Sequence, residues 1–198
     1  MTDNALIIFV KNLIEGHVKT RLAATLGNDG AMDIYKQLLK NTQNSILNFE
    51  TDKIVFYSDF IEEEIWGNNL FQNKIQEGND LGERMKNAFN SSFTAGYEKI
   101  VIIGTDCPGI NKSILENAFM ALNNLDIVIG PATDGGYYLL GMKKEYPFLF
   151  QNIEWSTDKV LQQTIDLCNK NRLSYFLLPE LSDIDEEKDL IHFKTIQD

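Results

Sequence analysis

Short, continuous apolar runs alternate along this chain with segments whose apolar residues recur three or four positions apart. Such runs are typical of strands buried on both faces, and the recurring spacing is typical of amphipathic helices. Strands alternating with helices predict βαβ crossovers, and hence one Rossmann-like, mainly parallel α/β sheet with helices on both faces. The predicted strands are Ala5–Val10, Lys53–Ser58, Lys99–Ile103, Asp126–Gly130, Gly136–Met142 and Ser174–Leu178.

Helices are expected in the intervening segments. Asp80 and Glu83 form a box-like helix cap, ahead of a buried stripe that begins with Leu81 and Met85. The other predicted helices are Asp29–Asn48, a short acidic one over Phe60–Asn68, Lys112–Leu122, Ser156–Asn171 and a closing helix from about Asp185.

Composition narrows the class of protein. The 198 residues contain no linker-like stretch, so a single domain over residues 1–198 is expected. A net charge of −11 argues against a nucleic-acid-binding surface, and neither a signal peptide nor a membrane-spanning run is evident. Two cysteines, Cys107 and Cys168, are too few for a disulfide framework and suit a reducing cytoplasm. We therefore expect a cytoplasmic protein.

The strand that begins at Lys99 ends in the cluster Thr105-Asp106-Cys107-Pro108. Open α/β sheets bind ligands just beyond the carboxyl ends of their strands, so the Asp106 carboxylate lies where a cation or ligand would bind. The alternative is that Asp106 only caps the following turn.

The segment after the first strand carries three cations in a strongly acidic protein, Lys11, Lys19 and Arg21. Gly16 allows a tight turn, and Lys19, Thr20 and Arg21 stand where a helix could begin, a position that suits anions. This favours phosphate binding over a solvated basic loop. The segment matches neither a Walker A loop nor a Gly-x-Gly-x-x-Gly motif.

Two further acidic segments follow strands. Asp134-Gly135-Gly136 is either a plain turn or a close-approach site with a hydroxyl-binding carboxylate. Asp183 and Asp185 face the same way if their segment is extended, and with Asp106 they would form a site for Mg²⁺ or Mn²⁺, which prefer oxygen ligands. Alternatively, Asp185 is a helix cap.

Taken together, the segments VKTRLA, TDCP, GPATDGGYYLLG and LSDIDEEKDL resemble a family of small bacterial glycosyltransferase-A-type proteins, the nucleotide-diphospho-sugar transferase-like proteins, some linked to arsenosugar biosynthesis. A more distant similarity is to guanylyltransferases acting on phospholactate or the molybdenum cofactor. The resemblance implies a GT-A fold and a bound nucleotide. It assigns phosphate contacts to Lys19 and Arg21, the metal to Asp106, and acceptor-side contacts to Asp134, Gly135 and Gly136.

The main expectation is an enzyme, with Asp106 and Asp134 as catalytic residues, that transfers a glycosyl group from a nucleotide sugar to a small acceptor. The alternative is a nucleotidyltransferase that joins a nucleoside triphosphate to a phosphorylated small molecule and releases pyrophosphate. Glycosyl transfer comes first because the Asp134 carboxylate would repel a phosphorylated acceptor. A non-catalytic nucleotide-binding module is a third hypothesis, and Cys107 is interpreted as a packed residue rather than a nucleophile.

Overall fold

The computed structural model describes residues 3–62, 66–67, 69–191 and 193 of the chain. Within these residues, seven strands form one sheet in the spatial order β3-β2-β1-β4-β6-β5-β7. The strands are β1 (Asn4–Val10), β2 (Asp52–Tyr57), β3 (Phe71–Ile75), β4 (Lys99–Ile103), β5 (Ile127–Pro131), β6 (Tyr137–Met142) and β7 (Tyr175–Leu177).

Most pairs of neighbouring strands are parallel. β1 lies at the centre of the parallel part, between β2 and β4, and β7 runs parallel to β5. β6 is antiparallel to both of its neighbours, β4 and β5. The predicted α/β class and the mainly parallel sheet are therefore confirmed.

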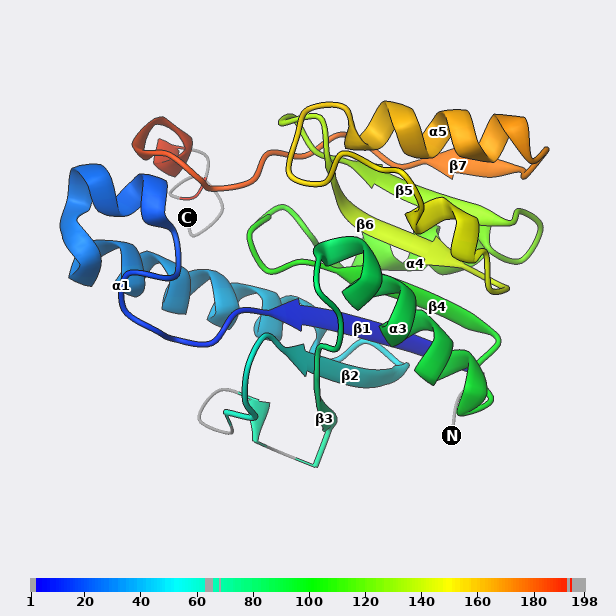
Figure 1. Cartoon of the computed structure of the whole chain (residues 1–198). Coiled ribbons are helices and arrows are strands. Elements are labelled where there is room, and N and C mark those ends of the chain that lie inside the picture. The colour runs from blue at the N-terminus through cyan, green and yellow to red at the C-terminus, as the bar shows by residue number, and fades with distance from the viewer. Residues whose placement is uncertain (1–2, 63–65, 68, 192, 194–198) are drawn as a thin grey trace.

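Helices cover both faces of the sheet, as expected (Figure 1). α1 (Thr20–Ile46) and α4 (Lys112–Ala121) pack on one face. α3 (Leu81–Thr94) and α5 (Val160–Lys170) pack on the other. Continuous β-branched strands such as β4 are buried on both sides because each of the two layers covers one set of their alternating side chains.

The capping prediction for α3 is confirmed with a shift of one residue. The Asp80 carboxylate accepts the Glu83 amide at 2.8 Å, whereas the Glu83 carboxylate accepts the Asn79 amide, not that of Asp80. The helix predicted over Asp29–Asn48 is longer than expected, because α1 begins at Thr20 and turns at Gly27, where φ is 74°. Its first section contains the apolar residues Leu22, Ala23, Ala24 and Leu26, but Gly27 separates them from the stripe that begins at Ala31, so the predicted helix did not include them.

Four further elements differ between the prediction and the structure. β3 was not predicted, because its sequence FQNKI is mostly polar and lies at the sheet edge. The helix predicted over Phe60–Asn68 falls partly on residues 63–65 and 68, which lie outside the described residues, and 60–62 are not helical. The helix expected from Ser156 begins at Val160. The closing helix starts as a 3₁₀ turn over Glu187–Asp189.

The segment after β7 crosses the molecule to the start of α1 (Figure 1). Leu181 pairs with Ala132 beyond the end of β5, and the Ile184 amide donates to the Asp106 carbonyl at 2.9 Å. Ile184 and Phe193 then pack in a small separate core with Leu22, Ala31 and Leu38 of α1. This crossing brings the C-terminal carboxylates to the ends of β1 and β4.

Candidate active site

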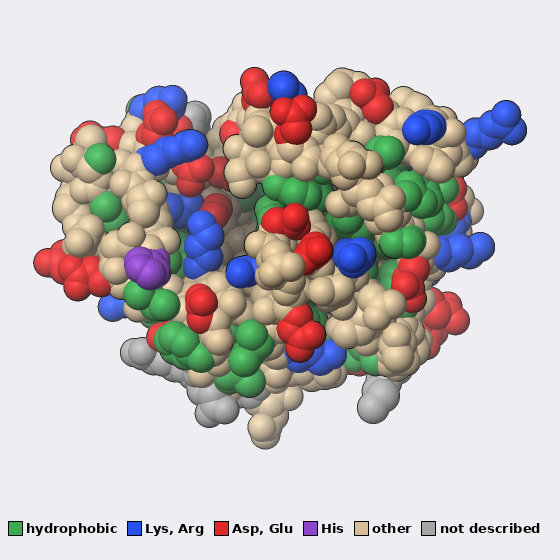
Figure 2. Space-filling view, in the orientation of Figure 1, with side chains coloured by type: hydrophobic (Ala, Val, Ile, Leu, Met, Phe, Trp, Pro, Cys, Tyr) green, Lys and Arg blue, Asp and Glu red, His purple; other side chains and the backbone are tan. Residues whose placement is uncertain are grey.

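A cavity of about 530 Å³ opens at the carboxyl ends of β1 and β4, a volume within the range of small-ligand sites. Figure 2 shows the hollow, with basic side chains along one rim and acidic side chains in its depth. It is lined by the segment after β1, the start of α1, Asp106, the turn between β5 and β6, the loop before α5, and the segment after β7. Nine of the eleven site residues predicted from the sequence line it: Lys11, Lys19, Thr20, Arg21, Asp106, Asp134, Gly136, Asp183 and Asp185.

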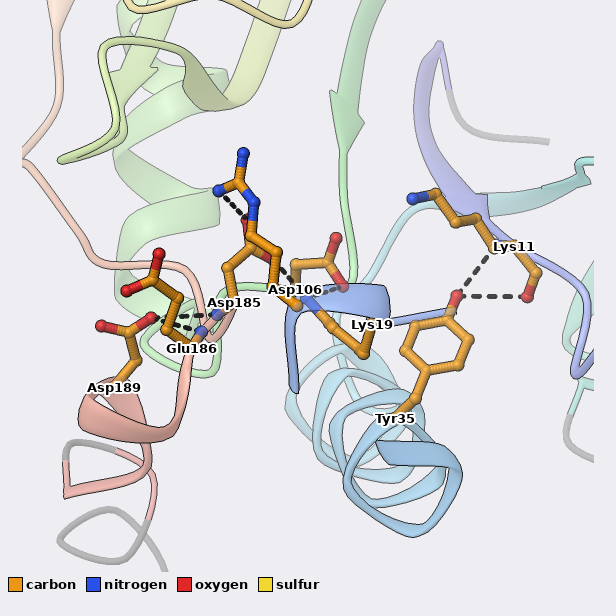
Figure 3. Close-up of polar contacts among 8 residues, drawn as sticks. Lys11, Lys19, Tyr35, Asp106, Asp185, Glu186 and Asp189 are labelled. Carbon is orange, nitrogen blue, oxygen red and sulfur yellow. Dashed lines mark hydrogen bonds and ion pairs between the residues drawn. The ribbon is translucent and has the colours of Figure 1, made fainter. Parts of the chain in front are cut away.

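Lys19 lies between two carboxylates, and its side chain is only 4% exposed. Its Nζ is 2.7 Å from an Asp106 oxygen and 2.9 Å from an Asp185 oxygen (Figure 3). Burial alone would lower the pKa of Lys19, but the charges of Asp106 and Asp185 outweigh it and raise the pKa. In the structure, the cation expected to contact phosphate is thus bound to the chain's own carboxylates.

Arg21 and Lys11 are the more accessible cations of the cavity. The Arg21 side chain is 70% exposed, and its Nη1 is 3.8 Å from an Asp185 oxygen, so it is only loosely held. The Lys11 backbone is fixed by the buried Tyr35 hydroxyl, which accepts from its amide at 2.9 Å and donates to its carbonyl at 3.1 Å (Figure 3). Tyr35 therefore positions the segment after β1.

α1 begins immediately after Lys19, as the sequence suggested. Lys19 adopts a left-handed conformation with φ 48°, and no side chain caps the helix. The first amides of α1 lack a capping acceptor, which leaves them available to an anion together with the exposed Thr20. Gly16 does not line the cavity; its φ of 74° shapes the turn of the preceding loop.

Asp183 faces other carboxylates. One of its oxygens is buried without a hydrogen-bond partner among the described residues. Burial, followed by the charges of Asp106 and Asp134, raises the pKa of Asp183 to about 7. Asp185 differs: burial alone would raise its pKa, but Lys19 outweighs that effect and the pKa is lowered. The two aspartates predicted as a pair are thus in opposite electrostatic environments.

The carboxylates of the cavity offer a small set of oxygen donors to a divalent ion. Within the described ranges, no group of three or more His, Cys, Asp or Glu side chains is arranged to hold a metal. Magnesium, however, is commonly held by one or two carboxylates plus substrate phosphates and water. Lys19 holds one oxygen of Asp106, so the second Asp106 oxygen and the unpartnered oxygen of Asp183 would form that smaller donor set. Asp185, occupied by Lys19 and Arg21, does not add to it.

The residues of the Asp134-Gly135-Gly136 turn have different positions relative to the cavity. Asp134 accepts the Gly136 amide at 2.9 Å and lines the cavity with Gly136. Gly135 does not line it: with φ 86°, it faces the backbone of Asp158, and a Cβ there would lie 2.3 Å from the Asp158 carbonyl oxygen. The expectation that Gly135 leaves room for a ligand is therefore corrected, because that space holds the loop before α5.

The cysteines are structural. Cys107 is buried, and burial, with the charge of Asp183, raises the pKa of its thiol, which disfavours a thiolate nucleophile. Cys168 is also unpaired and buried. Both observations agree with the interpretation of Cys107 as a packed residue.

Sequence reasoning missed two parts of the site. The loop Trp155–Asp158 lines the cavity. A second, more apolar cavity of about 270 Å³ adjoins the first and shares Tyr35, Asp106 and Tyr137 with it. No local motif marks these residues, since β1, β4, β6 and α3 together form the second cavity.

The sequence matches the model of a known protein family. A model of the family described as "uncharacterized protein conserved in bacteria (DUF2064)" matches residues 44–157, more than half of the chain. The chain belongs to the DUF2064 family. The matched range includes Asp106 and Asp134, whereas Lys19 and Asp183 lie outside it.

The sequence of this DUF2064 protein is similar to those of two named enzymes. It is 30% identical over 132 residues to a 2-phospho-L-lactate guanylyltransferase of Methanocaldococcus vulcanius, covering 65% of this chain and 57% of the relative. It is 28% identical over 130 residues to the enzyme of that name from Methanobrevibacter smithii, with 63% and 56% covered. The chain thus spans little more than half the length of these relatives.

A solved structure matches more completely. The crystal structure of a Desulfovibrio desulfuricans G20 protein, whose description proposes a nucleotide-diphospho-sugar transferase, superposes with a TM-score of 0.88 at 33% identity. The match covers 94% of this chain and 84% of that one. The expected nucleotide-diphospho-sugar transferase fold is confirmed.

In the described part of the DUF2064 chain, no helix combines the length and apolarity needed to cross a bilayer.

The Lys19 contacts predict a specific loss of stability. Lys19→Met leaves Asp106 and Asp185 facing each other without their shared cation, so the free energy of unfolding in urea should fall by about 1–3 kcal/mol. We place it below the cost of a fully buried pair because both carboxylates are more than a third exposed. Lys112→Met, which removes the exposed pair with Glu116, is the matched control and should change stability by less than about 0.5 kcal/mol. Equal losses would contradict the assignment.

The raised pKa of Asp183 predicts that Asp183→Asn stabilises the protein at high pH but not at low pH. Because its pKa is raised in the folded state to about 7, the protein loses stability from Asp183 as pH rises from about 4 through 7. Asp183→Asn removes this effect, so its melting temperature should exceed that of the parent at pH 8, with the difference vanishing near pH 4. Thermal unfolding in EDTA measures this. Asp166→Asn, an exposed change on α5, should show no such pH dependence; the same profile in both variants would refute the assignment.

Proposed function

We propose that this DUF2064 protein is a nucleotidyltransferase that joins a nucleoside triphosphate to a phosphorylated small molecule. The observation that carries the proposal is the likeness to two enzymes named 2-phospho-L-lactate guanylyltransferase. By their names, those enzymes transfer a guanylyl group to a phosphorylated acceptor. Since the chain spans little more than half of their length, their substrates are not transferred to it.

The cavity suits a triphosphate. Lys11, Arg21 and the uncapped start of α1 lie along the same wall, so fixed cations and helix amides would meet the phosphate oxygens together. The smaller apolar cavity adjoins this wall, and we assign the nucleobase to it. Its lining includes Phe9, Met85 and Leu139, which offer apolar surface to a flat ring.

The reaction would proceed by displacement at the α-phosphorus. An oxygen of the acceptor phosphate attacks that atom and forms the new P–O bond. The bond from the α-phosphorus to the bridging oxygen breaks, and its electron pair leaves with pyrophosphate. Arg21 and Lys11 would stabilise the charge that moves onto the leaving group.

Asp106 and Asp183 would hold Mg²⁺ or Mn²⁺, which when bound neutralises phosphate charge. Two roles remain predictions: that of Asp106 as a metal ligand and that of Asp134 as a catalytic residue. In this scheme Lys19 keeps Asp106 and Asp185 in place. A cytoplasmic location also stays a prediction.

Glycosyl transfer is the second candidate. It is supported by the Desulfovibrio desulfuricans protein, whose description proposes a nucleotide-diphospho-sugar transferase. From the sequence, glycosyl transfer was the main expectation because the Asp134 carboxylate would repel a phosphorylated acceptor. The order reverses because the relatives named as guanylyltransferases support the nucleotidyl alternative, and an ion at Asp106 and Asp183 would offset the repulsion.

Arg21→Ala should weaken the binding of nucleoside triphosphates by about ten- to a hundredfold, the loss of one charge-assisted hydrogen bond, while nucleoside binding is unchanged. Isothermal titration of each nucleotide and its nucleoside measures this. Lys36→Ala removes an equal charge from an exposed position of the same helix and should leave both affinities unchanged. A parallel fall of nucleoside and triphosphate affinity in Arg21→Ala would contradict the phosphate assignment.

Product analysis separates the two transferases. With GTP, ATP, CTP or UTP, Mg²⁺ or Mn²⁺, and a panel of phosphorylated acceptors, we expect pyrophosphate in equal amount to a new nucleotidyl product. Asp106→Asn should reduce the rate by at least about a hundredfold while the protein remains folded. Nucleoside diphosphate released from a nucleotide sugar, with every triphosphate inert, would instead establish glycosyl transfer.

A further inference from the structure

The cavity is divided by charge. Its basic lining residues, Lys11, His17, Lys19 and Arg21, all belong to the segment after β1 and the start of α1. The opposite end is formed by the turn at Asp134 and the loop Trp155–Asp158, and it contributes no Lys or Arg side chain to the described lining. Once the triphosphate lies on the basic wall, this acidic end remains for the body of the acceptor.

The loop that forms the acidic end is built to hold its shape. The Leu161 amide donates to the Gly135 carbonyl at 2.9 Å, and Gly135 packs directly on the Asp158 backbone. The Thr157 hydroxyl donates to the Glu154 carbonyl at 2.7 Å. These contacts fix the loop to the β5–β6 turn, so its side chains form a preorganised surface.

Lys159, the residue that follows this loop, does not line the cavity. Lys159 lies 2.9 Å from the Glu154 carboxylate, and neither residue lines the cavity. Asp158, the neighbour of Lys159, does line it, together with the exposed Ser156 and Thr157. The loop therefore offers hydroxyls and a carboxylate to a ligand, but no ammonium group.

Trp155 adds an aromatic surface. Its indole packs so closely on Gly82 that a Cβ at Gly82 would lie 2.3 Å from Nε1, and its ring stacks with Phe150 at 6.5 Å. These contacts fix the indole while leaving it partly exposed and in the cavity lining.

We propose that the acceptor is a phosphorylated polyhydroxy compound without a carboxylate, a sugar phosphate, whose hydroxylated body binds between Asp134, Asp158 and Trp155. This inference rests on the proposed nucleotidyl transfer. Carboxylates accept hydrogen bonds from hydroxyls, and an indole packs against the C–H face of a ring. A phosphorylated carboxylic acid such as phospholactate would instead bring its carboxylate against Asp134 and Asp158, which repel it. The chain would thus differ in acceptor from its named relatives.

The test compares two classes of phosphorylated acceptor, one without and one with a carboxylate. Hexose 1-phosphates and pentose phosphates are measured against phospholactate and 3-phosphoglycerate, with a non-hydrolysable triphosphate and Mg²⁺ present. Binding is followed by the fluorescence of Trp155 in a Trp66→Phe background, since Trp66 is buried and its Nε1 forms no hydrogen bond among the described residues. At least one sugar phosphate should bind about tenfold or more tightly than either acid and perturb Trp155.

A charge reversal gives the sharper outcome. Asp158→Lys should weaken sugar-phosphate binding and strengthen 3-phosphoglycerate binding, each by about tenfold. Asp166→Lys, an exposed change on α5 outside the cavity, should alter neither. Preference of the parent for the phosphorylated acids, or an equal response of the two variants, would overturn the inference.

Failure of the proposed function gives a different result. Pyrophosphate release with phosphorylated acids alone would overturn the acceptor inference and leave nucleotidyl transfer intact. Sugar-phosphate binding at Trp155 without pyrophosphate release from any triphosphate would support the acceptor surface and reject nucleotidyl transfer.

Discussion

The ammonium group of Lys19, buried between Asp106 and Asp185, is the interaction on which the arrangement of this site depends. It joins three segments that are distant in sequence: the start of α1, the end of β4 and the crossing segment after β7. A buried cation in a protein of net charge −11 requires counter-charges at short range, and the two aspartates supply them. The C-terminal segment is held at the sheet by this pair together with the Ile184 backbone contact to Asp106.

Because Lys19 is paired with Asp106 and Asp185, other groups of the cavity must supply the contacts to a ligand. In the proposed function, the groups that meet the phosphates are Arg21, Lys11 and the uncapped amides of α1. Tyr35 holds Lys11 in place through both of its backbone groups. The positive side of the cavity is thus a consequence of backbone positioning as much as of side-chain charge.

The carboxylates on the acidic side of the cavity repel one another, and the fold holds them together. Asp183 lies near Asp106 and Asp134, and its pKa is raised to about 7 because the fold places like charges together in a poorly solvated site. Such an arrangement costs stability and is typical of functional sites, where a ligand or ion relieves the repulsion. The rigid loop at Trp155 and Asp158 extends the same acidic surface toward the region assigned to the acceptor.

The sequence by itself determined the α/β class, most strands and the family resemblance, because buried parallel strands appear as unbroken apolar runs and helices carry their caps locally. It also located nine of the residues that line the cavity, since strand ends in such sheets converge at one edge. Tertiary structure alone decided which charges meet. Lys19 and Asp185 are 166 positions apart, and no local pattern indicates that they form an ion pair. The roles of Gly135 and Trp155 likewise depend on packing against Asp158 and Gly82, contacts made only when separate elements assemble.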